Sequence, residues 1–370
     1  MSKSLVVVPY DRARHESALI QLTERVLGVD AAARRQSVLD SFHDRMPGRD
    51  RTPLRHVVLD GDRAAGTLGY MPADFLVKGE RVPTRFTHDL FVDPAYALAG
   101  HRTLGKGLGT VLVENARGLG GFLPGGMWMT DSCHKIHLAS GFDDVSRLTT
   151  YTTVLDPAAF SLRRGFSSLK GHVSRVGLGV ARAVALTHAR RRVERDGALL
   201  RAVDRFDAAL DPEWMALART YSMTRVRDAA YLNWKYRDHP ALDYRALLVS
   251  RNGRPTGYVV WRPAPAGAVE TRAVIADFLV EKGDASTLQL LAARVMLDAA
   301  AQGIDSVAVL TTQAWAAGAL RALGFFPSRT RNAWVIAGWR DLIPADWLRT
   351  HEPWHVCLGD SDGDIWTGAM

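Results

Sequence analysis

The hydrophobic and polar positions in the first 155 residues predict short strands that alternate with helices. Apolar positions alternate with polar ones on both sides of the turn 60–62, which predicts a β-hairpin. A further strand ends before Pro94 and leads through a glycine-rich loop into an amphipathic helix. The predicted elements, in chain order, are a strand at 5–8, a helix at 15–27, the hairpin at 56–77, a strand at 85–94, a helix at 110–118, a strand at 125–132 and a short helix from 134 that Gly141 stops.

Residues from about 199 onward repeat this order of elements. Each half has its own hairpin turn, the second at Asn252-Gly253, and each ends with a helix followed by Gly-Phe, at Gly141 and at Gly324. Two copies of one α+β unit explain this repetition better than one large doubly wound sheet. We therefore predict an α/β fold with mixed sheets and flanking helices, present twice. The second copy contains strands at 199–207, 273–281 and 305–312, helices at 211–222, 286–302 and up to Gly324, and a hairpin at 244–264.

The chain has 370 residues, enough for two ordinary domains, and a formal charge of +8. That charge is local. The stretch 161–205 holds eleven Lys or Arg and three acidic residues, whereas the rest of the chain carries 36 of each sign. The composition excludes disorder, a collagen and a disulfide scaffold. An excess of positive charge that is confined to about forty-five residues gives little support for a nucleic-acid-binding protein.

The cysteines and the N-terminus indicate a compartment. Cys133 and Cys357 lie far apart in sequence, so they form neither a disulfide framework nor a CxxC metal pair, and we expect a reducing cytoplasm. The apolar run near the N-terminus is too short for a signal peptide or a membrane span. We expect a cytoplasmic protein, with peripheral contact at the inner membrane surface as an open alternative.

The basic stretch carries a helical pattern. Four valines recur at helical spacing and share one face, which predicts a linker helix packed through its valine stripe. The alternative is docking on an anionic membrane or on a phosphorylated or polysaccharide acceptor. Nucleic acid is disfavoured because 167–204 contains no Phe, Tyr or Trp for base stacking. The stripe consists of Val173, Val176, Val180 and Val184.

A glycine-rich loop after the strand ending at Pro94 carries the most specific motif of the chain. The run LFVDP, followed by LGKGLGTVLVENA, resembles the strand, loop and helix with which the GNAT superfamily of acyl-CoA N-acyltransferases binds the pyrophosphate of acetyl-CoA. Glycines allow close backbone approach to a diphosphate, and free N–H groups at a helix N-terminus donate to it. The predicted cofactor-binding residues of this loop are Gly105, Lys106, Gly107, Leu108, Gly109 and Thr110.

The loop departs from the family pattern at one position. Leu104 stands where the family has Arg or Gln, unless Arg102 takes that place in a second register that puts Thr110 at an apolar helix position. In the second half the corresponding segment offers one glycine, Gly283, followed by Asp284, whose carboxylate repels a diphosphate. We therefore expect acyl-CoA to bind in the N-terminal unit, and the C-terminal unit to be a degenerate partner.

The resemblance also implies catalytic positions. The thioester carbonyl is met by backbone N–H groups of the strand before the loop, here at Leu90, Phe91 and Val92. Strand alternation places the neighbours His88 and Asp89 on opposite faces, so that only one can line the site.

A general base in this family lies on that strand or the next. The candidates are His88, Asp89, Asp131 and Ser132. For each the alternative is a structural role, which for Ser132 is that of a helix cap.

A thiolate proton donor is expected four residues before the Gly of the first Gly-Phe pair. That position is His137, where the family frequently has Tyr, and an imidazolium is a competent acid. The equivalent position in the second half is Leu320, which cannot donate a proton.

We predict an acyl-CoA-dependent N-acyltransferase, with acetyl-CoA or another acyl-CoA as co-substrate, no metal, and a primary amine of a small molecule or of a sugar or amino-acid intermediate as acceptor. The alternatives are an aminoacyl-tRNA-dependent peptidyl-bridge transferase and a non-catalytic CoA-binding protein. The final DSDGD is predicted to be a polar turn. The predicted division is an N-terminal GNAT-like domain at 1–157, a basic linker at 158–198, a degenerate domain at 199–345 and a tail packed on it at 346–370.

Overall fold

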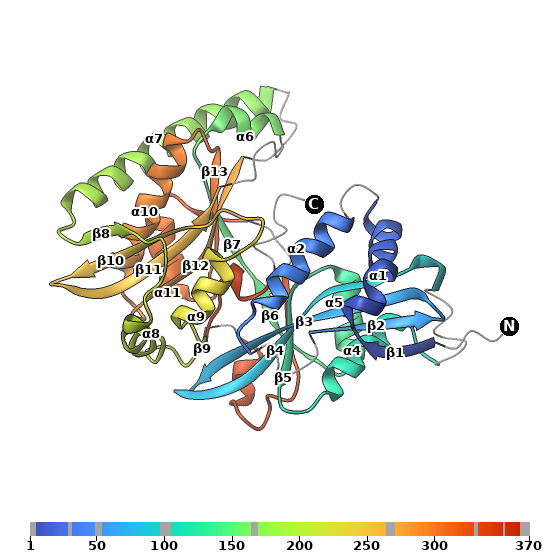
Figure 1. Cartoon of the computed structure of the whole chain (residues 1–370). Coiled ribbons are helices and arrows are strands. Elements are labelled where there is room, and N and C mark those ends of the chain that lie inside the picture. The colour runs from blue at the N-terminus through green and yellow to red at the C-terminus, as the bar shows by residue number, and fades with distance from the viewer. Residues whose placement is uncertain are drawn as a thin grey trace. The chain divides into compact units, whose positions relative to one another are not determined.

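The computed structural model describes residues 5–28, 32–48, 54–96, 105–163, 169–263, 271–328, 332–350 and 352–362. The chain forms two compact units (Figure 1). The first unit comprises Met1–Arg147 and Asn332–Thr350, and the second comprises Leu148–Arg331 and His351–Met370.

The first unit is built on a mixed sheet of strand order β1-β2-β3-β4-β5-β15-β6. The β4–β5 pair is parallel, while β1 to β4 and the β5–β15 pair are antiparallel. Its strands are β1 (Leu5–Pro9), β2 (Arg55–Asp60), β3 (Arg63–Val77), β4 (Glu80–Val92), β5 (Leu123–Met129), β6 (Asp143–Leu148) and β15 (Asn332–Ile336). Its helices are α1 (Arg12–Leu27), α2 (Ala32–Asp44), α4 (Leu108–Gly118) and α5 (Asp131–Ala139).

The second unit has an equivalent sheet of order β8-β10-β11-β12-β13-β7-β14, again with one parallel pair, β12–β13. The predicted hairpin turn is confirmed, with Asn252 and Gly253 at φ of 50° and 76°. The strands are β7 (Thr150–Val154), β8 (Leu199–Ala202), β10 (Arg245–Arg251), β11 (Arg254–Arg262), β12 (Arg272–Val280), β13 (Ser306–Leu310) and β14 (Phe326–Pro327), with β9 (Met223–Arg225) pairing β16 (Trp354–His355). The helices are α6 (Pro157–Arg163), α7 (Leu169–Arg195), α8 (Asp211–Ala218), α9 (Ala229–Leu232), α10 (Ala285–Ala301) and α11 (Ala314–Ala322).

One strand of each sheet comes from the other half of the chain. In the first sheet β15 lies between β5 and β6, and in the second β7 lies between β13 and β14. Contacts therefore group 332–350 with the first unit and 148–157 with the second. The division predicted from chain order places 148–157 in the N-terminal domain and 332–350 in the C-terminal domain and its tail. Hydrophobic patterning predicts that a segment is a strand but does not predict which sheet the strand joins.

The packing of α7 differs from the prediction. This helix packs on α10 through Ala185, Leu186 and Ala189, which are buried. The described valines of the stripe, Val176 and its neighbours at helical spacing, are instead exposed to solvent. The expectation that the valine stripe packs the linker helix is therefore wrong, because small side chains on the opposite face allow the close approach to α10. Within the described residues, no helix is long and apolar enough to cross a membrane.

Candidate functional site

The candidate site of the first unit lies where β4 and β5 separate. Their parallel pairing ends at Thr87 and Gly126. Just beyond, each strand is irregular: Asp89 and Trp128 have φ of 51° and 59°, and the register of the adjoining pairing shifts at both places. Such backbone costs about 1–3 kcal/mol per residue and is concentrated at functional sites in proteins. The following β4 residues, Leu90, Phe91 and Val92, are only half-buried.

The irregularity at Asp89 overturns the predicted alternation of His88 and Asp89. Both side chains are buried, and His88 Nδ1 lies 3.5 Å from Asp89 Oδ2. A strand of regular pleat would turn neighbouring side chains to opposite faces, but the left-handed backbone of Asp89 brings them together. The prediction that the two side chains lie on opposite faces of the strand is therefore wrong.

The Asp89 carboxylate is held by two arginines. Arg35 from α2 pairs with Oδ1, and Arg55 from β2 donates to Oδ2 at 3.0 Å. Burial acts to raise the pKa of Asp89, but the charge of Arg35, the contact with His88 and the charge of Arg55 outweigh it and hold the pKa well below its ordinary value. The Asp89 carboxylate is therefore ionised at neutral pH and already paired with two arginines, which favours a structural role.

His88 is part of a buried histidine pair. Its Nε2 lies 3.3 Å from His43 Nε2, and a side chain at Gly69 would collide with the His88 ring, since an added Cβ would lie 2.4 Å from Cε1. Burial, and then the neighbouring His88, lower the pKa of His43 well below its ordinary value, so His43 is neutral. The absence of a side chain at Gly69 is what allows the His88 ring to lie over β3.

His137 reaches the point where the two strands part. Its Nδ1 lies 2.9 Å from the Cys133 carbonyl oxygen, so this nitrogen carries the proton. Its Nε2 then accepts from Thr87 Oγ1 at 3.0 Å. Burial lowers the pKa of His137 to about 4, against the Cys133 carbonyl, which raises it. The predicted imidazolium is therefore not the form present at neutral pH.

The helix that follows β5 begins at the predicted carboxylate. Asp131 is the first residue of α5 and is exposed, so its carboxylate meets solvent at the end of β5. Thr130 rather than Ser132 caps the helix, with its hydroxyl accepting from Cys133 N at 3.3 Å. The cap predicted at Ser132 is thus provided two residues earlier.

The glycine loop leads directly into α4. Gly105 has φ of 67°, a conformation that favours glycine, and Gly107 is the N-cap. Leu108, Gly109 and Thr110 form the first turn of the helix, two residues before its predicted start. First-turn N–H groups have no acceptor inside a helix and attract anions. His101, Arg102 and Leu104 lie outside the described residues.

Two loop residues have packing or pairing partners. A side chain at Gly109 would approach Ile136 Cδ1 at 2.9 Å, so this glycine allows α4 to pack against α5. Lys106 Nζ pairs with Glu114 Oε2 at 2.6 Å on the surface. Exposed pairs of this kind contribute about 0–1 kcal/mol, so Lys106 can exchange this partner for an anionic ligand at little cost.

The equivalent helix start in the second unit is already occupied. The Asp284 carboxylate caps α10 by accepting from Thr287 N at 2.9 Å. A carboxylate in this place satisfies the helix N-terminus and repels a second anion. The absence of a diphosphate site in the second unit stays a prediction, which this carboxylate cap favours.

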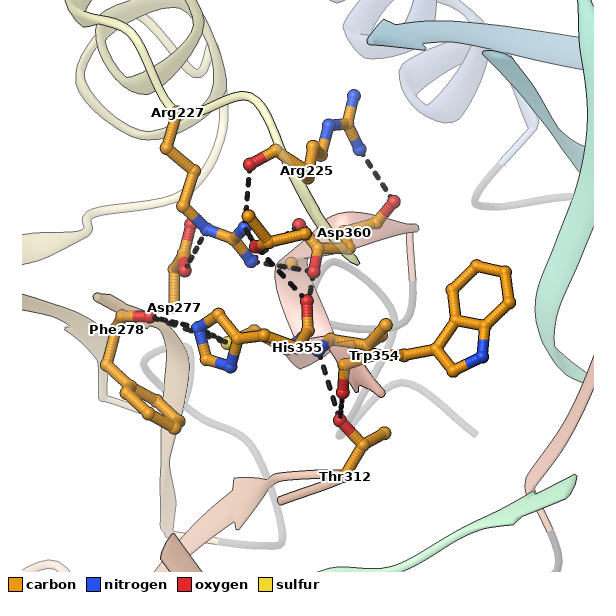
Figure 2. Close-up of polar contacts among 12 residues, drawn as sticks. Arg225, Arg227, Asp277, Phe278, Thr312, Trp354, His355 and Asp360 are labelled. Atoms are coloured by element: carbon orange, nitrogen blue, oxygen red, sulfur yellow. Dashed lines mark hydrogen bonds and ion pairs between the residues drawn. The ribbon is translucent and has the colours of Figure 1, made fainter. Parts of the chain in front are cut away.

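The strand separation of the second unit is filled by the chain itself. The β12–β13 pairing ends at Ile275 and Val309, and the segment 352–361 hydrogen-bonds to both sides of the gap (Figure 2). On the β12 side, His355 Nε2 donates to the Phe278 carbonyl oxygen at 2.9 Å. On the other side, Val356 N donates to Thr312 Oγ1 at 3.2 Å. The β12 residues beyond the gap are consequently fully buried.

A buried charge network fastens this segment. Arg227 donates to Asp277 at 2.8 Å and to Asp360 at 2.7 Å, and all three side chains have no exposed surface (Figure 2). The charges of Asp277 and Asp360 raise the pKa of Arg227 well above its ordinary value, against burial. The predicted polar turn of DSDGD is therefore wrong for its first residue, Asp360, which is a core ion-pair partner.

Solved structures match the chain, although no protein-family model and no curated protein does. N-myristoyltransferase of Saccharomyces cerevisiae, solved with bound myristoyl-CoA and inhibitors, matches with a TM-score of 0.61 at 11% identity, over 95% of this chain and 87% of its own. GCN5-related N-acetyltransferases of Anabaena variabilis and Kribbella flavida give TM-scores of 0.58 and 0.56 at 11% and 14% identity, over 90% of this chain and 72% and 71% of theirs. The chain therefore has the fold shared by these acyltransferases. The resemblance seen in the sequence, and the predicted fold class, are confirmed at the level of fold.

Proposed function

We propose that the chain is an acyl-CoA-dependent N-acyltransferase whose first unit binds the acyl-CoA. The observation that carries the proposal is the separation of β4 from β5 at Thr87 and Gly126, with the glycine-capped start of α4 on the chain between these two strands. Solved neighbours of the same fold include an enzyme with bound myristoyl-CoA. The first turn of α4 would hold the diphosphate, and the half-buried strand 90–92 would hold the thioester arm.

The proposed reaction is direct transfer without a covalent enzyme intermediate. The acceptor amine, in its neutral form, attacks the thioester carbonyl carbon, so that a C–N bond forms and the C–S bond breaks. The proton lost by the amine ends on the sulfur, which leaves as the CoA thiol. Backbone N–H groups of β4 beyond Asp89 would stabilise the negative charge that develops on the carbonyl oxygen.

Among the predicted catalytic residues, Asp131 is our proposed proton acceptor. Its carboxylate is exposed at the end of β5, where it can receive the amine proton through water. His137 and Thr87 would supply a hydrogen-bonded pair at the point where β4 and β5 separate. His88 and Asp89, which are buried with their partners, would keep the strand irregularity in place.

The second unit is proposed to bind no acyl-CoA. Its gap holds the segment 352–361, and Asp284 caps the helix start where a diphosphate would lie. The helix α7 packs on α10 rather than forming a free-standing arm, which favours an acyl-CoA donor over the aminoacyl-tRNA alternative.

The proposed acceptor is a primary amine on a small molecule or on a sugar or amino-acid intermediate, and the proposed setting is the bacterial cytoplasm. The basic stretch 161–205 would attract the protein to an anionic membrane or to a phosphorylated acceptor. The exposed valines of α7 favour the membrane over the acceptor as its partner.

Release of the CoA thiol, measured colorimetrically with acetyl-CoA and longer acyl-CoAs over a panel of primary amines, tests the function. We expect amine-dependent release, and Asp131→Asn is expected to lower turnover by about 10²-fold with little change in acyl-CoA affinity. Lys135→Gln, which also removes one charge from an exposed position of α5, is the matched control and should behave like the native chain. Acyl-CoA binding without release for any amine would favour the non-catalytic alternative.

A further inference from the structure

The helix α7 presents an apolar stripe to solvent. Val176, Val180 and Val184 follow one another at intervals of four residues and are 66%, 62% and 50% exposed. At 100° per residue they share one face, and the buried residues Ala185 and Ala189 lie on the opposite face, against α10. A surface helix of a globular protein normally turns its branched apolar side chains inward, so this orientation needs an explanation.

Exposed arginines continue the same surface toward the end of the helix. Arg190, Arg191 and Arg195 are exposed and follow the valines within three turns. Arg182 and Arg192 point back to the protein, where they donate to the Leu155 carbonyl oxygen and to Asp196. The helix thus has two sets of arginines, one that contacts the rest of the protein and one that is exposed to solvent.

We infer that this face, comprising Val176, Val180, Val184, Arg190, Arg191 and Arg195, is a docking surface for a bilayer rich in anionic phospholipid. The valines would enter the boundary between headgroups and acyl chains, and the arginines would pair with lipid phosphates. The excess of eight positive charges in 161–205 supplies the complementarity to such a surface. The inference does not depend on the proposed acyltransfer.

Other occupants fit the surface less well. A second copy would bring two basic stretches together, and their like charges repel. A single-stranded nucleic acid would find no aromatic side chain in 167–204 on which to stack. An anionic bilayer satisfies both the apolar and the cationic part of the face.

Sedimentation of the full chain with vesicles tests the inference. We expect sedimentation with vesicles that mix phosphatidylglycerol with phosphatidylcholine, weakening with added salt, and none with phosphatidylcholine alone. Replacing Arg190, Arg191 and Arg195 by Gln should reduce partitioning by about 100-fold, since each arginine near such a surface contributes about 1 kcal/mol. Replacing the three valines by Ser should reduce it by about tenfold, because the charge is unchanged but the apolar contact is lost.

Val6→Ser with Leu342→Ser is the matched control, because both residues are exposed apolar side chains of the first unit. This variant should partition like the native chain, and thermal melts should show that all variants fold, since every altered side chain is exposed. The inference is overturned if the native chain does not sediment, or if both triple variants sediment as it does. A dimer that only the valine variant loses, or salt-dependent RNA binding without vesicle binding, would overturn it in favour of the other occupants.

Discussion

At the scale of single residues, Asp89 has a left-handed backbone conformation and a buried carboxylate that pairs with two arginines. Asn tolerates positive φ and matches Asp in size, so Asp89→Asn removes the charge without changing the backbone requirement. Arg35 and Arg55 would then be left near a neutral amide in a buried place. We expect the free energy of unfolding to fall by about 3–5 kcal/mol in a urea titration. Asp74→Asn, which breaks the pair with the half-exposed Arg81, should cost about 0–1 kcal/mol.

His137 gives a prediction about acid stability. Its folded-state pKa of about 4 lies below that of an unfolded histidine, so the unfolded chain takes up a proton that the folded chain does not. Stability is therefore fully present above about pH 6.5 and is lost as the pH falls toward 4. Between pH 7 and pH 5, the unfolding free energy of His137→Gln should fall by about 2 kcal/mol less than that of the native chain. An equal fall in both proteins, with the exposed His188→Gln as control, would contradict the neutral buried histidine.

Sequence reasoning missed the partners of these residues. Thr87, Arg35, Arg55 and His43 all contact predicted site residues, but their partners lie 34 to 54 residues away along the chain. A motif spans a few neighbouring positions, and pairing across the fold leaves no such signal. The place of Thr87 in the site follows from the end of the β4–β5 pairing, which no local sequence pattern marks.

At the scale of elements, hairpins and amphipathic helices were predictable because local patterning defines them. The turn at Gly61 and the helix stop at Gly141 both adopt the positive φ that glycine allows. The solvent-facing stripe of α7 was not predictable, because a period of 3.6 residues shows which residues share a face but not what that face meets. The same limit applied to Asp360, whose buried partner Arg227 lies 133 residues away.

At the scale of the whole molecule, the exchanged strands determine what can fold alone. A fragment of residues 1–157 lacks β15, so β5 and β6 lose the strand between them. We expect this fragment to show no cooperative thermal unfolding. Joining residues 1–147 through a short flexible linker to 332–350 restores the sheet order and should restore a cooperative transition in calorimetry. A cooperative transition in the simple fragment would contradict the exchange.

The central claim is that one acyl-CoA binds, in the first unit only. Titration calorimetry of the full chain with acetyl-CoA and with longer acyl-CoAs tests it most directly. We expect one site per chain, and a loss of at least about tenfold in affinity for Gly107→Glu, which places a carboxylate at the N-cap of α4. Gly118→Glu, at the other end of the same helix where a side chain meets open space, should bind like the native chain. No binding, two sites per chain, or binding unchanged by Gly107→Glu would contradict the claim.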